Sequence, residues 1–320
     1  MRILITGGFG FIGGRLALHL AQAGHQILLG SRKVISPPTW LQHAEVKHIE
    51  WDDSHALELS CNGVDVVIQA AGMNAHDCAT DPVAALSFNG VANARFVAAA
   101  NRAGVQRFIY LSTAHVYGSP LVGTITEVTC PRNLQPYATS HLAGEHAVLS
   151  ASQCGQIEGI VLRLSNAFGA PVHKDVNCWK LLVNDLCKQA VQTRKLVLKT
   201  SGLQQRDFIS MTDLCRVAEH LAVNGSSKQI SIFNVGSGVS QSVFVMAQSI
   251  QQRCEQVLGF EPVLERVQGE ADDLHPTLFY RIDNLAAIGI KSDFLENFAE
   301  IDSLLSFCQQ TFCKAQNPGA

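Results

Sequence analysis

Residues 2–14 read R-I-L-I-T-G-G-F-G-F-I-G-G, and this stretch decides the fold. The run 2–6 is short, apolar and rich in β-branched residues, which indicates a buried strand. Residues 15–24 carry apolar side chains at helical spacing and end in glycine, which indicates a helix and its stop. A glycine loop between a strand and a helix lets the backbone and free helical N–H groups approach a pyrophosphate. The stretch therefore predicts a dinucleotide site formed by Gly7, Gly10, Phe11, Ile12 and Gly13.

Strand-like and helix-like runs alternate through the first half of the chain. Further strand-like runs lie at 26–29, 45–50, 65–69, 107–111 and 159–164, and a long helical pattern covers 83–104. This alternation predicts an α/β fold, a Rossmann-type doubly wound parallel sheet.

Composition restricts the classes of partner. The chain has 320 residues, is 47% hydrophobic and carries a net charge of −3 without a block of like charge, which argues against nucleic-acid and membrane partners. We find no run of 18 uncharged apolar residues and therefore expect a soluble cytoplasmic protein. The ten cysteines form no C-x-x-C pair and the twelve histidines no H-E-x-x-H, so we expect reduced thiols and no metal site.

The end of the second strand-like run bears on the choice of cofactor. A carboxylate there would bond the adenosine ribose hydroxyls and favour NAD, but the sequence is G-S-R-K at 30–33. The hydroxyl of Ser31 and the guanidinium of Arg32 suit a 2′-phosphate. We therefore favour NADP(H), with NAD(H) as the alternative if Arg32 and Lys33 only begin a solvated loop.

Several stretches together resemble the extended branch of the short-chain dehydrogenase/reductase superfamily, the group of UDP-galactose 4-epimerase and related sugar-nucleotide enzymes. The resemblance covers almost the whole chain. It rests on T-G-G-F-G-F-I-G at 6–13, Asn89 within S-F-N-G-V, L-S-T-A-H-V-Y-G at 111–118, L-R-L-S-N-A-F-G at 162–169, R-D-F-I-S-M-T-D at 206–213 and F-N-V-G-S-G at 233–238.

The resemblance implies individual roles. Tyr137 would be the catalytic tyrosine, and Thr113 would hold the substrate oxygen. Asp52 or the adjacent Asp53 would contact adenine. The turn under the cofactor would be formed by Ala70, Ala71 and Gly72. The substrate would be contacted by Asn166, Arg206, Asn74 and His115, the first two near its diphosphate; for the last two an ordinary packing or solvent role is an equal alternative.

The resemblance also implies a division of the chain. Residues 1–168 and 207–237 would form the dinucleotide-binding domain, and residues 169–206 and 238–320 a smaller substrate domain. Substrate choice would lie in the segment 172–199. A homodimer would form through helices at roughly 89–104 and 137–152, by analogy with the family.

Residues 137–141, Y-A-T-S-H, depart from the family pattern, which has lysine where His141 stands. Four residues apart on a helix, Tyr137 and His141 share one face. The family's lysine bonds the nicotinamide ribose, and its charge lowers the pKa of the tyrosine. A neutral histidine can make the ribose contact, but with an ordinary pKa of about 6.5 it supplies little charge at neutral pH.

A weakened cation harms a tyrosine that must accept a proton more than one that must donate it. Our leading hypothesis is therefore a reductase of a keto-sugar nucleotide that uses NADPH, with Tyr137 as the acid, Thr113 holding the oxygen and His141 on the ribose. One alternative is an NAD-dependent nucleotide-sugar epimerase or dehydratase in which a carboxylate or substrate phosphate charges His141. Others are an enzyme of small carbonyls or steroid-like ketones, and a non-enzymatic nucleotide-binding protein with a degenerate site.

Overall fold

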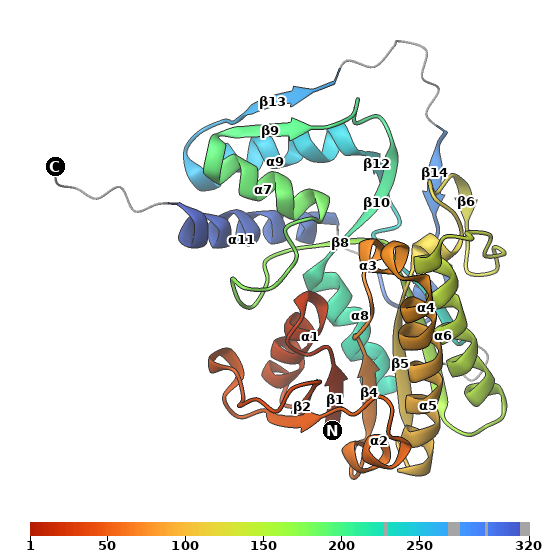
Figure 1. The fold of residues 1–320 in the computed structure, drawn as a ribbon. Helices are drawn as coiled ribbons and strands as arrows, with labels where there is room; N and C mark the ends of the chain where they lie inside the picture. Colours follow the sequence, from red (N-terminus) through yellow and green to blue (C-terminus); the bar gives the residue numbers. More distant parts are fainter. Residues whose placement is uncertain (227–229, 268–275, 292–293, 314–320) are drawn as a thin grey trace.

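The computed structural model describes residues 1–226, 230–267, 276–291 and 294–313. Figure 1 shows two parts: a large α/β part built around one parallel sheet, and a smaller part of helices and short strands beside it. The chain begins in the large part, and helix α11 (Phe294–Phe312) closes the smaller one.

The large sheet has seven parallel strands in the order β11-β7-β5-β4-β1-β2-β3. Their bounds are Arg2–Thr6 (β1), Gln26–Ser31 (β2), Glu45–His48 (β3), Val66–Gln69 (β4), Arg107–Thr113 (β5), Glu158–Leu164 (β7) and Ile232–Val235 (β11). The chain runs outward from β1 to β3 and then returns to start again at β4, so the strand order reverses between β1 and β4. In such sheets this reversal is the point at which ligands bind.

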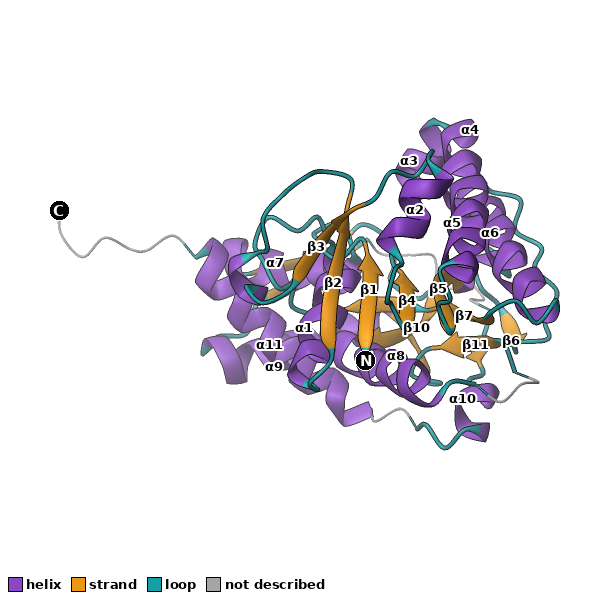
Figure 2. Ribbon diagram, turned by 90° about the horizontal axis from the view of Figure 1, so that it is seen from below, coloured by secondary structure: helices purple, strands orange, loops and turns teal. Residues whose placement is uncertain are grey.

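Helices cover both faces of this sheet (Figure 2). One face packs on α1 (Phe11–Gln22) and α8 (Met211–Asn224). The other packs on α2 (Ser54–Ser60), α5 (Asn93–Arg102) and α6 (Pro136–Gln153). Because both faces are buried, the strands are continuous apolar runs such as R-I-L-I-T. The predicted doubly wound α/β fold is confirmed.

Element bounds differ from the predictions at several ends. Helix α1 starts at Phe11, four residues early, because the glycines at 13 and 14 lie inside its first turn. Strand β5 continues through Thr113, which places the two hydroxyl residues on the sheet itself. The expected helix at 83–104 is a continuous helical run made of α4 (Pro82–Ala85), a π-helical turn η2 (Leu86–Ala92) and α5.

The run Pro82–Arg102 is also long and apolar enough, by length and composition alone, to cross a membrane. Half of its most apolar window is buried within the protein, as in a core helix. Phe96 of this run, for example, is fully buried against the large sheet. Its apolar character is therefore accounted for by packing in the large part.

The smaller part has its own apolar core. It contains α7 (Leu182–Thr193), α9 (Val243–Leu258) and α11, which pack around the paired strands β9 (Lys195–Leu198) and β13 (Val263–Arg266). A three-stranded sheet of β8 (Asn166–Phe168), β10 (Gln205–Ser210) and β12 (Ser240–Ser242) connects it to the large part.

Part of the C-terminal segment returns to the large part, although we assigned residues 238–320 to the smaller domain. Strand β14 (Leu278–Tyr280) pairs with β6 (Gly123–Ile125), and α10 (Asp283–Ala287) lies against β11. Leu285 joins the core under the parallel sheet, and the amide of Asn284 donates to the carbonyl of Ile232. Three short elements complete the described chain: η1 (Thr39–Leu41), α3 (Ala75–Thr80) and η3 (Ala114–Val116).

Candidate active site

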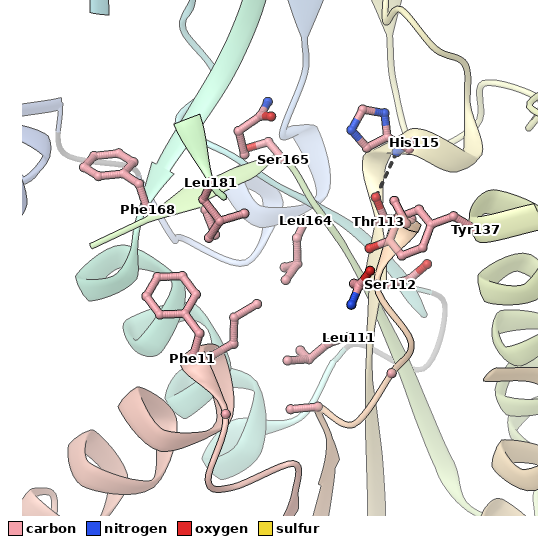
Figure 3. A pocket seen from close by; sticks show the side chains of 18 of the residues that line it. Phe11, Leu111, Ser112, Thr113, His115, Tyr137, Leu164, Ser165, Phe168 and Leu181 are labelled. Carbon is pink, nitrogen blue, oxygen red and sulfur yellow. Dashed lines mark hydrogen bonds between the residues drawn. The ribbon is translucent and has the colours of Figure 1, made fainter. Parts of the chain in front are cut away.

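A cavity of about 600 Å³ lies between the carboxyl ends of the large sheet and the smaller part. Figure 3 shows its two sides, with Thr113 and Tyr137 facing Phe11 and Leu181 across the opening. Most of the predicted site residues line it. These are Gly7, Gly10, Phe11, Ile12, Gly13, Ala70, Ala71, Gly72, Asn74, Thr113, His115, Tyr137, His141, Asn166 and Arg206.

The floor of the cavity is backbone. Gly7 has a φ of +66°, and a Cβ there would lie 2.9 Å from the nitrogen of Ala71; a Cβ at Gly13 would overlap the carbonyl of Gly7. The loop is closed by a hydrogen bond of 2.8 Å from the nitrogen of Gly10 to the oxygen of Gly7. No side chain caps the N-terminus of α1, so its first N–H groups are available to an anion. This cradle fits the pyrophosphate of a dinucleotide.

Four residues predicted to contact the adenosine end lie outside the cavity. Ser31 ends β2, its hydroxyl accepts from the nitrogen of Lys33, and Arg32 is exposed. Asp53 caps α2 by accepting from the nitrogens of His55 and Ala56. Asp52 is exposed and pairs with Arg95 at 3.2 Å. All four follow β2 or β3 on the same edge of the sheet as the glycine loop, and their roles toward a cofactor stay predictions.

Thr113 and Tyr137 meet at the end of β5. The nitrogen of His115 donates to Oγ1 of Thr113 at 3.1 Å, which leaves the hydroxyl hydrogen of Thr113 free to donate. Burial raises the pKa of Tyr137, and a hydrogen bond with Thr113 acts in the opposite direction. The phenol is therefore protonated at neutral pH and lies where it can give a proton to a ligand oxygen.

His141 lies one turn along α6 from Tyr137, with the two ring centroids 4.6 Å apart. Its side chain is 6% exposed, and burial lowers its pKa to about 4. Among the described residues, no carboxylate makes a hydrogen bond or ion pair with it. The imidazole is therefore neutral at pH 7, and it does not supply the fixed charge of a lysine.

The carboxylate nearest to it along α6 is already paired. Glu145 is fully buried, and both its oxygens accept from Arg163, with a closest approach of 2.6 Å. It also accepts from the hydroxyl of Ser112. Because these partners neutralise its charge, Glu145 anchors β5, β7 and α6 rather than charging His141.

A network of amides joins the turn after β4 to α6. Asn89 accepts from the nitrogen of Met73 at 3.0 Å and donates to the hydroxyl of Ser140 at 3.0 Å. Met73 directly follows the cavity turn at Ala70–Gly72. Asn74 in the same segment caps α3, where its side chain accepts from the nitrogen of Asp77. Asn89 thus fixes the separation between the cradle and the tyrosine helix.

The opposite wall carries positive charge. Arg206 of β10 is partly buried, and its guanidinium donates to the amide oxygen of Gln204 at 3.0 Å. It has no carboxylate partner among the described residues. Asn166 of β8 donates to the carbonyl of Asp207 at 2.8 Å, which ties this wall together. A guanidinium without a carboxylate partner can bind an anion.

Several lining residues were not predicted from the sequence. They are Met73, Ala75, Leu111, Leu164, Ser165, Ala167, Phe168, Asn177, Lys180, Leu181, Leu182, Val183 and Phe208. Five of them, Asn177, Lys180, Leu181, Leu182 and Val183, come from the segment after β8, where the sequence carries no clear periodicity. Lys180 adds a second cation to the wall of Arg206, and only the fold reveals its proximity.

That segment is held by one buried carboxylate from α11. Glu300 accepts from the guanidinium of Arg15 on α1 at 2.5 and 3.0 Å and from the backbone nitrogen of Ala170 at 3.1 Å. It also accepts from the nitrogen and hydroxyl of Thr212 at the start of α8. Gly169 has a φ of +150°, and a Cβ there would overlap the carboxylate. Glu300 therefore joins α11 of the smaller part to α1 and α8 of the large part.

The cavity of this doubly wound α/β fold thus combines an uncapped glycine loop, a buried tyrosine and, on the opposite wall, two cationic side chains. Residues 3–236 match the NAD dependent epimerase/dehydratase family, and the chain belongs to that family.

Named relatives span most of the chain. The human dTDP-D-glucose 4,6-dehydratase is 27% identical over 78% of this chain and 73% of its own length. The dTDP-6-deoxy-L-talose 4-dehydrogenase (NAD(P)(+)) of Kitasatospora kifunensis is 30% identical over 74% of each chain. The solved UDP-glucose 4-epimerase of Thermotoga maritima with UDP-glucose shares the fold, with a TM-score of 0.80 and 18% identity over 97% of this chain and 99% of that one.

Proposed function

We propose that this protein is an NAD-dependent nucleotide-sugar epimerase. The observation that carries the proposal is Arg206, a partly buried guanidinium without a carboxylate partner in the described structure, in the same cavity as the glycine cradle and Tyr137. A substrate diphosphate at Arg206 and Lys180 would place the sugar between this wall and Tyr137. The family match and the epimerases and dehydratases among the relatives support this substrate class.

The cofactor fits the glycine cradle, and when bound it supplies the acceptor and donor of hydride. An ionised Tyr137 would accept the proton of the sugar hydroxyl and later return it to the same oxygen. Because burial raises the pKa of this phenol and His141 is neutral, only a small fraction of Tyr137 would be ionised at neutral pH, and oxidation of the sugar should speed up as pH rises. Thr113 donates a hydrogen bond to the same oxygen. The overall reaction inverts one carbon without net oxidation, so one bound cofactor serves many turnovers.

Epimerisation fits the cavity better than dehydration. Loss of water from a keto sugar needs a base for a carbon-bound proton and an acid for the departing hydroxyl. No Asp or Glu is among the described residues that line the cavity. The groups there that can exchange a proton include Tyr137, Thr113, His115 and His141, and these suffice for a single carbon.

A keto-sugar reductase using NADPH is the second candidate. The neutral His141 favours a protonated Tyr137, as reduction requires, and the dehydrogenase of Kitasatospora kifunensis carries NAD(P) in its name. The family match nevertheless supports the epimerase or dehydratase alternative better than this leading sequence-based hypothesis.

The first experiment identifies the nucleotide released from denatured purified protein. The intact protein is then incubated with UDP- and dTDP-sugars, without added cofactor, and the products are resolved by NMR. Tightly held NAD and an epimer of the added sugar support the proposal. Exchangeable NADPH, consumed only with a keto-sugar nucleotide, replaces it by the reductase. A protein that binds nucleotide but converts neither nucleotide sugars nor keto-sugar nucleotides would be the non-enzymatic nucleotide-binding alternative.

Arg206→Gln tests the proposed nucleotide-sugar site separately from the dinucleotide site. Loss of a charged hydrogen bond of about 1.5–3 kcal/mol weakens nucleotide-sugar binding by roughly 10- to 150-fold and leaves dinucleotide affinity unchanged. The matched control is Arg102→Gln, which removes a guanidinium that pairs with Glu58 outside the cavity. Equal sugar-nucleotide affinity in both variants would exclude Arg206 as the diphosphate site.

A further inference from the structure

The neutral His141 is held by a tyrosine from another element. The hydroxyl of Tyr110, in the middle of β5, lies 3.1 Å from Nδ1 of His141. Both side chains are buried, with exposures of 2% and 6%. Gly144 makes the contact possible, because a Cβ there would lie 2.5 Å from the Tyr110 oxygen. Tyr110 thus reaches under α6 and contacts the far side of the imidazole from the cavity.

The direction of this hydrogen bond follows from the partners of the hydroxyl. Tyr110 remains protonated, because burial raises its pKa well above the ordinary value. Its oxygen makes one side-chain hydrogen bond in the described structure, the one to Nδ1. If Nδ1 carried the proton, the hydroxyl hydrogen would be buried without an acceptor, which costs about 1–3 kcal/mol. The favoured arrangement is therefore O–H of Tyr110 donating to an unprotonated Nδ1, with the imidazole proton on Nε2.

The protonated nitrogen faces the cavity. A Cβ at Gly72, in the cavity turn, would lie 3.5 Å from Cε1 and 3.8 Å from Nε2 of His141. Nε2 has no acceptor among the described residues, although the side chain is more than nine-tenths buried. A buried donor aimed into a cavity is satisfied by the ligand that enters it.

We propose that Tyr110 is a positioning residue that holds His141 in its Nε2–H tautomer, so that a neutral imidazole donates a hydrogen bond to an oxygen of the bound dinucleotide. The proposal rests on the proposed function for the identity of the ligand. It explains how the site keeps a donor at position 141 without the charge of a lysine. The ring of Tyr110 packs in the core, and its hydroxyl determines which nitrogen of His141 carries the proton.

The tautomer can be read directly, without cofactor. Long-range ¹H–¹⁵N NMR of protein labelled with ¹⁵N-histidine distinguishes Nε2–H, Nδ1–H and charged imidazoles, and loss of the signals in His141→Gln assigns them. We expect Nε2–H in the wild type and a mixture of tautomers in Tyr110→Phe. A predominant Nδ1–H or charged form in the wild type overturns the proposal.

Dinucleotide affinity gives the second readout. Tyr110→Phe should weaken binding by roughly 2- to 10-fold, the effect of one net hydrogen bond. Tyr280→Phe is the matched control, because it also removes one buried hydroxyl, which donates to the carbonyl of Arg163 away from His141. It should lower stability while leaving the tautomer and the affinity unchanged.

The outcomes separate this inference from the proposed function. Equal affinities in Tyr110→Phe and Tyr280→Phe overturn the positioning role even if the protein is an epimerase. A wild type that shows the Nε2–H form but binds neither NAD nor NADP refutes the proposed function and the dinucleotide as the acceptor, while the Tyr110–His141 geometry stands.

Discussion

The two walls of the cavity are built in different ways. The wall where we propose that the cofactor binds, the cofactor wall, is backbone from two short segments, the loop 7–13 and the turn Ala70–Gly72, where absent side chains create the space. The wall where we propose that the substrate binds, the substrate wall, is made of side chains such as Arg206 and Lys180. Glu300 of α11 ties Ala170, which precedes the segment of Lys180, to α1 and α8. Tyr137 and His141 lie at the junction. The first wall depends on local sequence, and the second depends on long-range contacts.

The largest effect is expected at the junction. Tyr137→Phe removes the proton donor and acceptor, so turnover should fall by about 10²- to 10⁴-fold. The ring remains, so affinities for dinucleotide and nucleotide sugar, measured by titration calorimetry, should be nearly unchanged. Substantial remaining turnover would remove Tyr137 as the acid–base group.

The next largest effect is expected at Glu300, whose hydrogen bonds hold the chain at Ala170, before the substrate segment. Glu300→Gln keeps the shape but leaves Arg15 without its carboxylate partner, and the free energy of unfolding should fall by about 3 kcal/mol. Binding of nucleotide sugar should weaken more than binding of dinucleotide, because Glu300 holds Ala170 at the start of the substrate segment. Denaturant unfolding and calorimetry measure the two effects.

The control for Glu300 lies on the same helix. Asp302 pairs with Arg253, and both side chains are about a quarter exposed, at 29% and 24%. Asp302→Asn should therefore cost at most about 1 kcal/mol and leave both affinities unchanged. If Glu300→Gln and Asp302→Asn change stability and nucleotide-sugar affinity equally, Glu300 does not hold the substrate wall in place.

A change of comparable size in the free energy of unfolding is expected at low pH, because His141 is buried in its neutral form. The folded protein holds His141 with a pKa of about 4, against 6.5 for the ordinary group. Between these values the unfolded chain binds the proton and the folded chain does not, so His141 makes stability rise with pH across this window and fall as pH drops from 6.5 to 4. The full contribution is roughly 3 kcal/mol.

The pH effect must be measured as a difference, because buried Asp207, whose pKa burial raises to about 6, acts in the opposite sense. Its folded form binds the proton first, so it adds stability as pH falls from 6 to its ordinary value. Unfolding free energies of the wild type and His141→Gln at pH 7 and pH 4.5 isolate the histidine. A pH dependence that is the same in both would mean that His141 is not held neutral by burial.

The smallest effect concerns the cofactor wall. Gly13→Ala forces a methyl against the carbonyl of Gly7, and overpacking of about 1–3 kcal/mol should weaken dinucleotide binding by roughly 5- to 150-fold. Gly24→Ala, at a glycine with open space around it, is the control for adding a methyl group away from the cavity; its φ of +87° adds backbone strain that Gly13 does not have. Nucleotide-sugar affinity should be unchanged in both glycine variants. In Glu300→Gln, by contrast, nucleotide-sugar affinity should fall more than dinucleotide affinity.

The sequence by itself determined the fold class and the cofactor wall. Strand, glycine loop and helix follow one another along the chain, and the φ of +66° at Gly7 favours glycine. The close approach of Gly7 to the turn after β4 comes from the pairing of β1 with β4 in the sheet. It also showed that position 141 is not lysine, and physical chemistry predicted a weak cation there.

Only the tertiary structure decided the substrate wall and the state of His141. Lys180 and Arg206 line one cavity, and Glu300 meets Arg15 from the other end of the chain. Both arrangements depend on how the smaller part packs, which no local pattern encodes. Tyr110 reads as one more core residue of β5 until its hydroxyl is seen beside Nδ1 of His141. A pKa and a tautomer depend on burial and on partners from other elements, and these exist only after the chain has folded.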